Sequence, residues 1–157
     1  MQNALTMHRW QVALALLAVA MARGYAWAGV CTLSASPINL GSYNGLSARA
    51  TVSVGQISYD CTGTFLTGIK IALAPGLSGA AMRQCTGNNG SLLYFLSLDP
   101  AGAAVWGDGS SGTTLYFNPA PATGKLVVVP VYAHAPPHQK DAPTGRCRDV
   151  ITVVASF

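Results

Sequence analysis

The segment 134–141 holds the densest group of side chains that could do chemistry. It reads HAPPHQKD and contains His134, His138 and Asp141. Imidazole and carboxylate groups so close in sequence could bind a metal ion or exchange protons with a substrate. Two prolines interrupt the segment, however, and no regular spacing fixes the three groups relative to one another. Because ligands on an unbraced loop are poorly preorganised, we interpret the segment as a polar hairpin loop.

The rest of the chain offers little catalytic chemistry. It contains no Gly-x-Ser-x-Gly motif, no paired carboxylates and no phosphate-binding loop, and all five acidic residues are aspartates spread singly along the chain. Asp99 and Asp108 flank Trp106 and are typical turn formers. The basic residues are scattered, although a nucleic-acid site requires them to cluster. We therefore expect no enzyme, no cofactor, no metal, no small-molecule substrate and no nucleic-acid partner.

The four cysteines, Cys31, Cys61, Cys85 and Cys147, are a second chemical feature. An even number of cysteines in an exported chain indicates two disulfides. Metal binding is the competing interpretation, but no Cys-x-x-Cys spacing supports it. On the residues alone, all three ways of pairing the cysteines stay open.

Export is indicated by residues 1–28, which we interpret as a signal peptide. His8 and Arg9 precede an uncharged apolar run from Trp10 to Ala22, and small residues flank Trp27 at a predicted cleavage site after Ala28. The run is shorter than the roughly 20 residues that span a bilayer, which argues against the alternative of an uncleaved anchor. We therefore expect an exported chain with a single domain over residues 29–157.

The hydropathy pattern predicts an all-β domain. Half of the chain is hydrophobic and only 9% is charged, which excludes a disordered chain or a coiled coil. Apolar residues alternate with period two, and turn residues separate the segments. Strands are expected over residues 31–35, 51–61, 69–73, 92–98, 115–117, 126–132 and 147–157. The apolar positions change parity at Gly55-Gln56, which predicts a β-bulge, and Pro130 predicts a bulge or an unpaired edge. Six or seven such strands predict an antiparallel β-sandwich.

Several short motifs occur together in an order that resembles the spore coat protein U domain, the subunit type of archaic chaperone–usher pili. They include Leu-Gly-Ser-Tyr at 40–43, Gly-Gln-Ile-Ser-Tyr-Asp-Cys at 55–61, Trp-Gly-Asp-Gly at 106–109 and Gly-Arg-Cys-Arg-Asp at 145–149. The resemblance covers essentially all of residues 31–157. The positions that carry it are Gly41, Tyr43, Gly55, Arg83, Tyr94, Trp106, Gly107, Asp108, Tyr132, Gly145 and Asp149.

The resemblance implies an immunoglobulin-like antiparallel β-sandwich that lacks its final strand. In this family a periplasmic chaperone fills the resulting groove with a strand of its own, and a neighbouring pilus subunit then replaces it at the outer-membrane usher. Such β-strand addition uses backbone hydrogen bonds for affinity and side-chain pockets for specificity. The resemblance places the protein in the periplasm and then at the cell surface. It implies that the last strand borders the groove through Ile151, Val153, Ala155 and Phe157.

One departure from the family pattern concerns the cysteines. Cys147 stands where the family has a tyrosine, and Cys85 is also additional. Two additional cysteines suggest a bond between them, which leaves Cys31–Cys61 as the bridge that the family usually has. The alternative is that Cys85 and Cys147 are free or link subunits.

A second departure concerns the donor strand. Cleavage after Ala28 would leave only Gly29 and Val30 before Cys31, whereas a donor strand needs about five to ten residues. We therefore expect a subunit that accepts a strand without donating one, at the tip end of the fibre, where it would resemble an adhesin. The charge-free segments 77–82 and 101–106 are candidate contact surfaces, or else ordinary turns with Trp106 in the core. The alternative function is a stand-alone secreted spore-coat or extracellular matrix protein.

Overall fold

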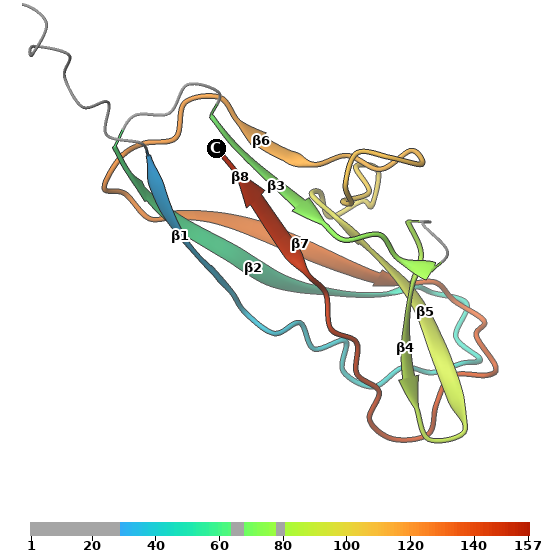
Figure 1. Ribbon diagram of the computed structural model, residues 1–157. Helices are drawn as coiled ribbons and strands as arrows, with labels where there is room; N and C mark the ends of the chain where they lie inside the picture. Colours follow the sequence, from blue (N-terminus) through green and yellow to red (C-terminus); the bar gives the residue numbers. More distant parts are fainter. Residues whose placement is uncertain (1–28, 64–67, 78–80) are drawn as a thin grey trace, which may run out of the picture.

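The computed structural model describes residues 29–63, 68–77 and 81–157, so the predicted signal peptide and residues 78–80 lie outside the described part. Figure 1 shows two layers of strands. The strands are β1 (Val30–Ala35), β2 (Thr51–Thr62), β3 (Ile69–Leu73), β4 (Arg83–Gly87), β5 (Gly90–Ser97), β6 (Tyr116–Asn118), β7 (Val127–Ala135) and β8 (Val153–Ser156). Among these residues no helix is long and apolar enough to cross a membrane.

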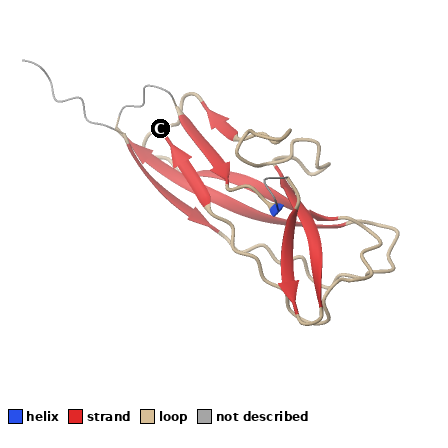
Figure 2. Ribbon diagram, turned by 45° about the vertical axis from the view of Figure 1, so that its right-hand side comes forward, coloured by secondary structure: helices blue, strands red, loops and turns tan. Residues whose placement is uncertain are grey.

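The strands form two antiparallel sheets. The larger sheet has the order β1-β2-β7-β5-β4, and the smaller has the order β6-β3-β8. Figure 2 shows that strands and connecting loops make up nearly all of the described fold. The predicted immunoglobulin-like sandwich is therefore confirmed.

The core lies between the two sheets because their facing sides are apolar. Ile57 and Tyr59 of β2 and Val131 of β7 are buried against Ile69 and Ile71 of β3. These residues alternate with exposed or partly exposed neighbours, as expected for strands with one face in the core.

The bulge predicted at Gly55-Gln56 in β2 is wrong. Its pairing with β7 continues without an extra residue, from Thr51 opposite Ala135 to Tyr59 opposite Val127. The parity of the apolar residues changes because Val52 and Val54 lie on the outer face, where they are 49% and 60% exposed. The strand itself keeps a single frame.

The last strand is shorter than predicted. Regular pairing begins only at Val153, opposite Leu73, and ends at Ser156. Strand β3 ends at Leu73, so residues 147–152 run on with little strand pairing beyond a bridge from Arg148 to Thr86. Strand β4, which pairs with β5, was not predicted because its sequence RQCTG shows no clear alternation.

Both disulfides implied by the family resemblance are confirmed. Cys31 and Cys61 lie directly opposite each other on β1 and β2, and their Cα atoms are 4.1 Å apart. Cys85 of β4 is bonded to Cys147, with Cα atoms 5.4 Å apart. By loop-closure entropy, these loops of 30 and 62 residues would stabilise the fold by about 3.6 and 4.3 kcal/mol.

Candidate functional site

A groove of about 1180 Å³ opens into the core between the two sheets. Its floor is the inner face of the large sheet, with Ile57, Leu92, Leu96, Val131 and Ala133. Residues 35–43, which begin at the last residue of β1, form one wall, and residues 145–151, which precede β8, form the other. The groove is therefore apolar at its base and bordered by extended chain on both sides.

Strands β1 and β8 each lie at the end of a sheet and leave one edge unpaired. Within the described residues, β1 pairs only with β2, and β8 pairs only with β3. Figure 1 shows β1 and β8 ending their sheets on the same side of the molecule. An unpaired strand edge presents free N–H and C=O groups that can template a further strand.

Along the last segment, partly buried side chains alternate with exposed ones. Ile151 and Val153 belong to the groove lining, and Ala155 packs against the core further along β8. The residues between them, Thr152 and Val154, are exposed. Phe157 lies at the end of the segment and is 49% exposed.

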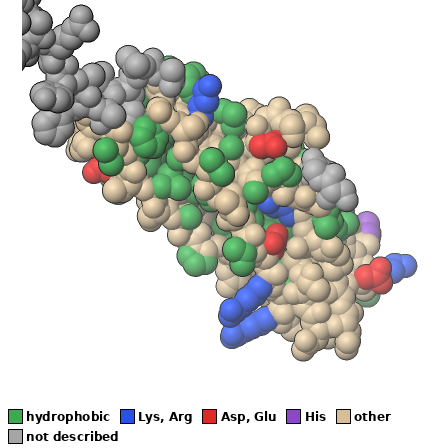
Figure 3. All heavy atoms as spheres, viewed as in Figure 1, with side chains coloured by type: hydrophobic (Ala, Val, Ile, Leu, Met, Phe, Trp, Pro, Cys, Tyr) green, Lys and Arg blue, Asp and Glu red, His purple; other side chains and the backbone are tan. Residues whose placement is uncertain are grey.

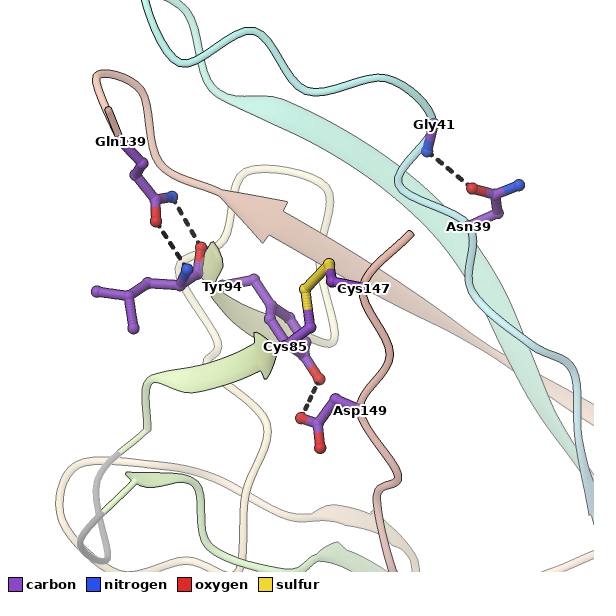
Figure 4. The surroundings of a disulfide bond; sticks show 8 residues. Asn39, Gly41, Cys85, Tyr94, Gln139, Cys147 and Asp149 are labelled. Carbon is purple, nitrogen blue, oxygen red and sulfur yellow. Dashed lines mark hydrogen bonds between the residues drawn. A yellow bond between two sulfur atoms is a disulfide. The ribbon is translucent and has the colours of Figure 1, made fainter. Parts of the chain in front are cut away.

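The wall at residues 145–151 is fastened to β4 and β5 (Figure 4). The Cys85–Cys147 disulfide joins it to β4, and the Tyr94 hydroxyl donates to Asp149 Oδ2 at 2.6 Å. Burial raises the pKa of Tyr94, and the hydrogen bond to Asp149 raises it further, so this phenol stays protonated as a donor.

Arg83 lies behind this wall and is only 5% exposed. It stands opposite Tyr94 in the β4–β5 register, and its guanidinium donates to the carbonyl of Ala74. Burial lowers the pKa of Arg83, while Tyr94 and Asp149 act in the opposite direction. Arg83, Tyr94 and Asp149, far apart in the sequence, thus form one polar cluster that supports the groove wall.

The opposite wall is braced by Tyr43 and Gln139. The Gln139 side chain bonds the backbone of Leu93, accepting from its N–H at 2.7 Å and donating to its carbonyl at 2.8 Å. The Tyr43 hydroxyl donates to the carbonyl of Pro136 at 2.6 Å and accepts from the Gln139 N–H at 3.2 Å. In Figure 4, Gln139 points toward β5, and Asn39 caps the turn at Gly41.

Gly55 is needed where this wall crosses β2. A Cβ atom at Gly55 would lie 2.5 Å from Cγ1 of Ile38, which is too close for any ordinary contact. Ser36 is held on the same strand by bonds to the N–H and carbonyl of Gln56, each at 2.9 Å. The absent side chain of Gly55 therefore lets Ile38 pack against the sheet as part of the wall.

The comparison with known families agrees with this geometry. The sequence profile of the Spore Coat Protein U domain matches residues 15–154. The chain belongs to this family. No curated protein matches the chain at a significant level. The Spore Coat Protein U domain is a structural domain of pili and coats rather than an enzyme family.

Most other family positions have structural roles in the Spore Coat Protein U domain seen here. Trp106 is fully buried, and its indole N–H donates to the carbonyl of Ile71 at 2.9 Å. The Gly107 carbonyl accepts from the N–H of Leu73 at 3.0 Å, and a Cβ at Gly107 would clash with Thr113. Asp108 accepts from the hydroxyl and N–H of Ser110, which lowers its pKa.

Gly145 and Tyr132 complete the set of family positions. Gly145 has a φ of 95°, a left-handed conformation that favours glycine at the start of the groove wall. Tyr132 pairs with Val54 across β7 and β2. Gly145 belongs to the groove lining, whereas Tyr132 does not.

The segment 101–106, predicted as a possible contact surface, folds over the outer face of the large sheet. The Asp99 carboxylate accepts from the N–H groups of Ala101, Ala103 and Ala104, which lowers the pKa of Asp99. Trp106 lies in the core, so it is not available for contact. Residue 77 is described, but residues 78–80 of the other predicted surface are not.

The structure separates the histidines that opened the sequence argument. His134 is a buried residue of β7, where Nε2 is 2.9 Å from the Ser97 hydroxyl and the ring stacks on Phe95 at 4.8 Å. His138 is exposed in the following loop with a φ of 60°, and Asp141 is also exposed. In the described part of the chain, no three such side chains form a group that could hold a metal ion.

Proposed function

We propose that this protein is an exported structural subunit of a chaperone–usher pilus and that its groove accepts a β-strand from a partner. The observation that carries the proposal is the apolar groove between the segment that follows β1 and the segment that precedes β8, two strands that each leave one edge unpaired. A strand laid there would bond to the free backbone groups on either side. Its alternate side chains would reach Ile57, Leu96 and Val131 on the floor.

The partner strand would come first from a periplasmic chaperone and then, at the outer-membrane usher, from the neighbouring subunit. Left empty, such a groove exposes core side chains and strand edges, which is an aggregation hazard. The scarcity of charge on the chain, only 9% of its residues, fits a protein that is sheltered throughout assembly.

Within the fibre we assign the subunit to the end that accepts a strand and donates none, an adhesin-like tip. Strand β1 already begins at Val30, and Cys31 is bonded to Cys61. If the signal peptide is cleaved after Ala28, too few residues precede β1 to cover a neighbour's groove. N-terminal sequencing of the assembled protein tests this position, and a mature N-terminus well upstream of Gly29 would contradict it.

Expression in the periplasm with and without a pilus chaperone tests the central proposal. We expect the chain alone to aggregate or to be degraded and the chaperone to rescue it as a soluble complex. A stable monomer without any chaperone would overturn the proposal and favour the stand-alone coat or matrix protein.

Two substitutions on β8 make the test specific to the groove. Val153→Asp places a charge in the groove lining and should abolish chaperone capture, whereas Val154→Asp, on the exposed face of the same strand, should leave capture intact. Deleting Ser156 and Phe157 should also abolish capture. If this shortened chain accumulates normally without chaperone, the assignment of β8 to the groove edge is wrong.

A further inference from the structure

The groove has a charged end as well as an apolar floor. Its lining contains four charged side chains, of which three are basic, namely Lys140, Arg146 and Arg148, and one is acidic, Asp149. All four come from one stretch of chain, whereas the opposite wall, residues 35–43, contains no charged residue. Figure 3 shows basic side chains gathered at the lower edge of the face that carries most of the visible hydrophobic side chains.

The single carboxylate does not neutralise these cations. Asp149 accepts a hydrogen bond from Tyr94, and the buried Arg83 lies close enough to interact electrostatically with it. Lys140, Arg146 and Arg148 are exposed, and none of them forms an ion pair with another described residue. The wall therefore presents an uncompensated positive charge to whatever enters the groove.

The fold holds the backbone of two of the basic residues, Arg146 and Arg148, in place. The Cys85–Cys147 disulfide lies between Arg146 and Arg148 in sequence and ties both neighbours to β4. The backbone of Arg148 also forms an isolated β-bridge with Thr86. The Arg146 carbonyl lies so close to Gly87 that a Cβ atom at Gly87 would not fit. The backbone that carries Arg146 and Arg148 is thus a fixed part of the groove wall.

We infer that the groove selects a partner strand that carries acidic side chains at the end facing Arg146 and Arg148. This inference rests on the proposed strand-accepting function and adds the chemistry of the partner. Alternating apolar residues would fill the floor, and aspartate or glutamate would follow at one end of the strand. Charge complementarity of this kind adds specificity and speeds association.

The same argument favours a different protein as the donor over another copy of this chain. Residues 1–28 contain two arginines and no acidic residue. The five aspartates all lie within the folded strands and loops of the described part. A basic segment of this chain would meet the cations of the wall with like charge.

Four synthetic twelve-residue peptides test the inference. Each alternates valine with threonine, and each carries either two glutamates or two glutamines at its N-terminal or its C-terminal end. Binding is measured by fluorescence anisotropy on the protein exported to and purified from the periplasm. If it is purified with a chaperone, the readout is displacement of the chaperone at equal peptide concentrations.

In one orientation we expect the glutamate peptide to bind about threefold to thirtyfold more tightly than its glutamine counterpart, as two exposed ion pairs allow. The advantage should shrink between low and high salt. Arg146→Gln with Arg148→Gln should remove it, whereas the matched variant Arg49→Gln with Lys125→Gln, outside the groove lining, should retain it.

The outcomes separate the two proposals. If glutamate and glutamine peptides bind equally in both orientations, the acidic-strand inference is wrong while the strand-accepting function stands. If no peptide binds, both are overturned. Equal or tighter binding of a peptide with two lysines in place of the glutamates would also overturn the inference and favour a second copy of this chain.

Discussion

At the scale of single residues, the family positions mostly build the walls of the groove. Arg83, Tyr94 and Asp149 form a polar cluster behind one wall, and Tyr43 braces the other. Each cluster brings together residues from distant parts of the chain. Buried polar groups of this kind are costly when a partner is removed, because the remaining group loses its hydrogen bond.

We predict that stability falls at alkaline pH because of two tyrosines, Tyr94, which is buried, and Tyr116, which is partly buried. Burial, followed by the hydrogen bond between Tyr116 and Tyr59, raises the pKa of Tyr116 to about 12, and the pKa of Tyr94 is also raised. Both phenols are protonated in either state below about pH 10, the unfolded value. Above pH 10 the unfolded chain releases protons first, so stability is lost as the pH rises toward 12.

The measurement is the melting temperature between pH 8 and pH 11. Tyr116→Phe should lower the melting temperature at pH 8 by breaking the bond to Tyr59 and should flatten its decline above pH 10. A melting temperature of the unchanged protein that does not fall in this range would contradict the prediction.

We also predict that Gly55→Ala destabilises the fold by about 1–3 kcal/mol, because its new methyl group overlaps Ile38. Chemical unfolding of the two single variants and of the double variant Gly55→Ala with Ile38→Ala measures the coupling. The double variant should lose less free energy of unfolding than the sum of the losses in the two single variants. Simple additivity would show that Ile38 does not pack on Gly55.

At the scale of elements, the segment before β8 is held mainly by contacts other than strand pairing. Residues 147–152 lie beyond the end of β3, so the disulfide to β4 and the Tyr94–Asp149 bond set their position. The wall of the groove therefore depends on links between elements.

We predict that Cys85→Ser with Cys147→Ser lowers the free energy of unfolding by about 4 kcal/mol by the loop-entropy relation. It should also weaken capture of a strand in the groove, since it frees the wall that carries Arg146 and Arg148. The comparison variant is Cys31→Ser with Cys61→Ser, at the β1–β2 pair, where the expected loss of stability is similar. Unchanged strand binding in the first variant would show that the disulfide does not organise the wall.

At the scale of the whole molecule, the protection of backbone amides from hydrogen exchange should depend on whether a strand is central or at an edge of its sheet. Strands β2 and β7 are paired on both sides, whereas β1 and β8 are edges. We predict slow amide exchange in β2 and β7 and fast exchange in residues 36–45 and 145–153. Addition of a groove-filling strand should slow exchange in the two fast segments, and a change confined to β4 and β6 would contradict this assignment.

Much of the fold could be predicted from period-two alternation. The strands over residues 31–35, 69–73 and 126–132 are close to β1, β3 and β7. Alternation failed where both faces carry apolar residues, as at Val52 and Val54, since an outward valine has the same sequence signal as an inward one. It also failed for β4, whose residues are fixed by a disulfide and by buried Arg83.

The candidate site could be predicted only in part. The alternation of Ile151, Val153 and Ala155 is visible in the sequence, and two of these side chains line the groove. Ile38 gave no signal, because its place in the wall depends on the missing side chain of Gly55, 17 positions away. The positive wall gave no signal either, since the run that holds Lys140, Arg146 and Arg148 does not show by itself that these side chains face a groove.

The sequence by itself determined the all-β class, the family and the cysteines available for disulfides, because alternation and motif order are local properties of the chain. Only the tertiary structure decided where the sandwich stays open and which charges face that opening. Both depend on which strand ends each sheet and where β3 stops pairing with the last segment. These are contacts between distant residues, and local patterns do not encode them.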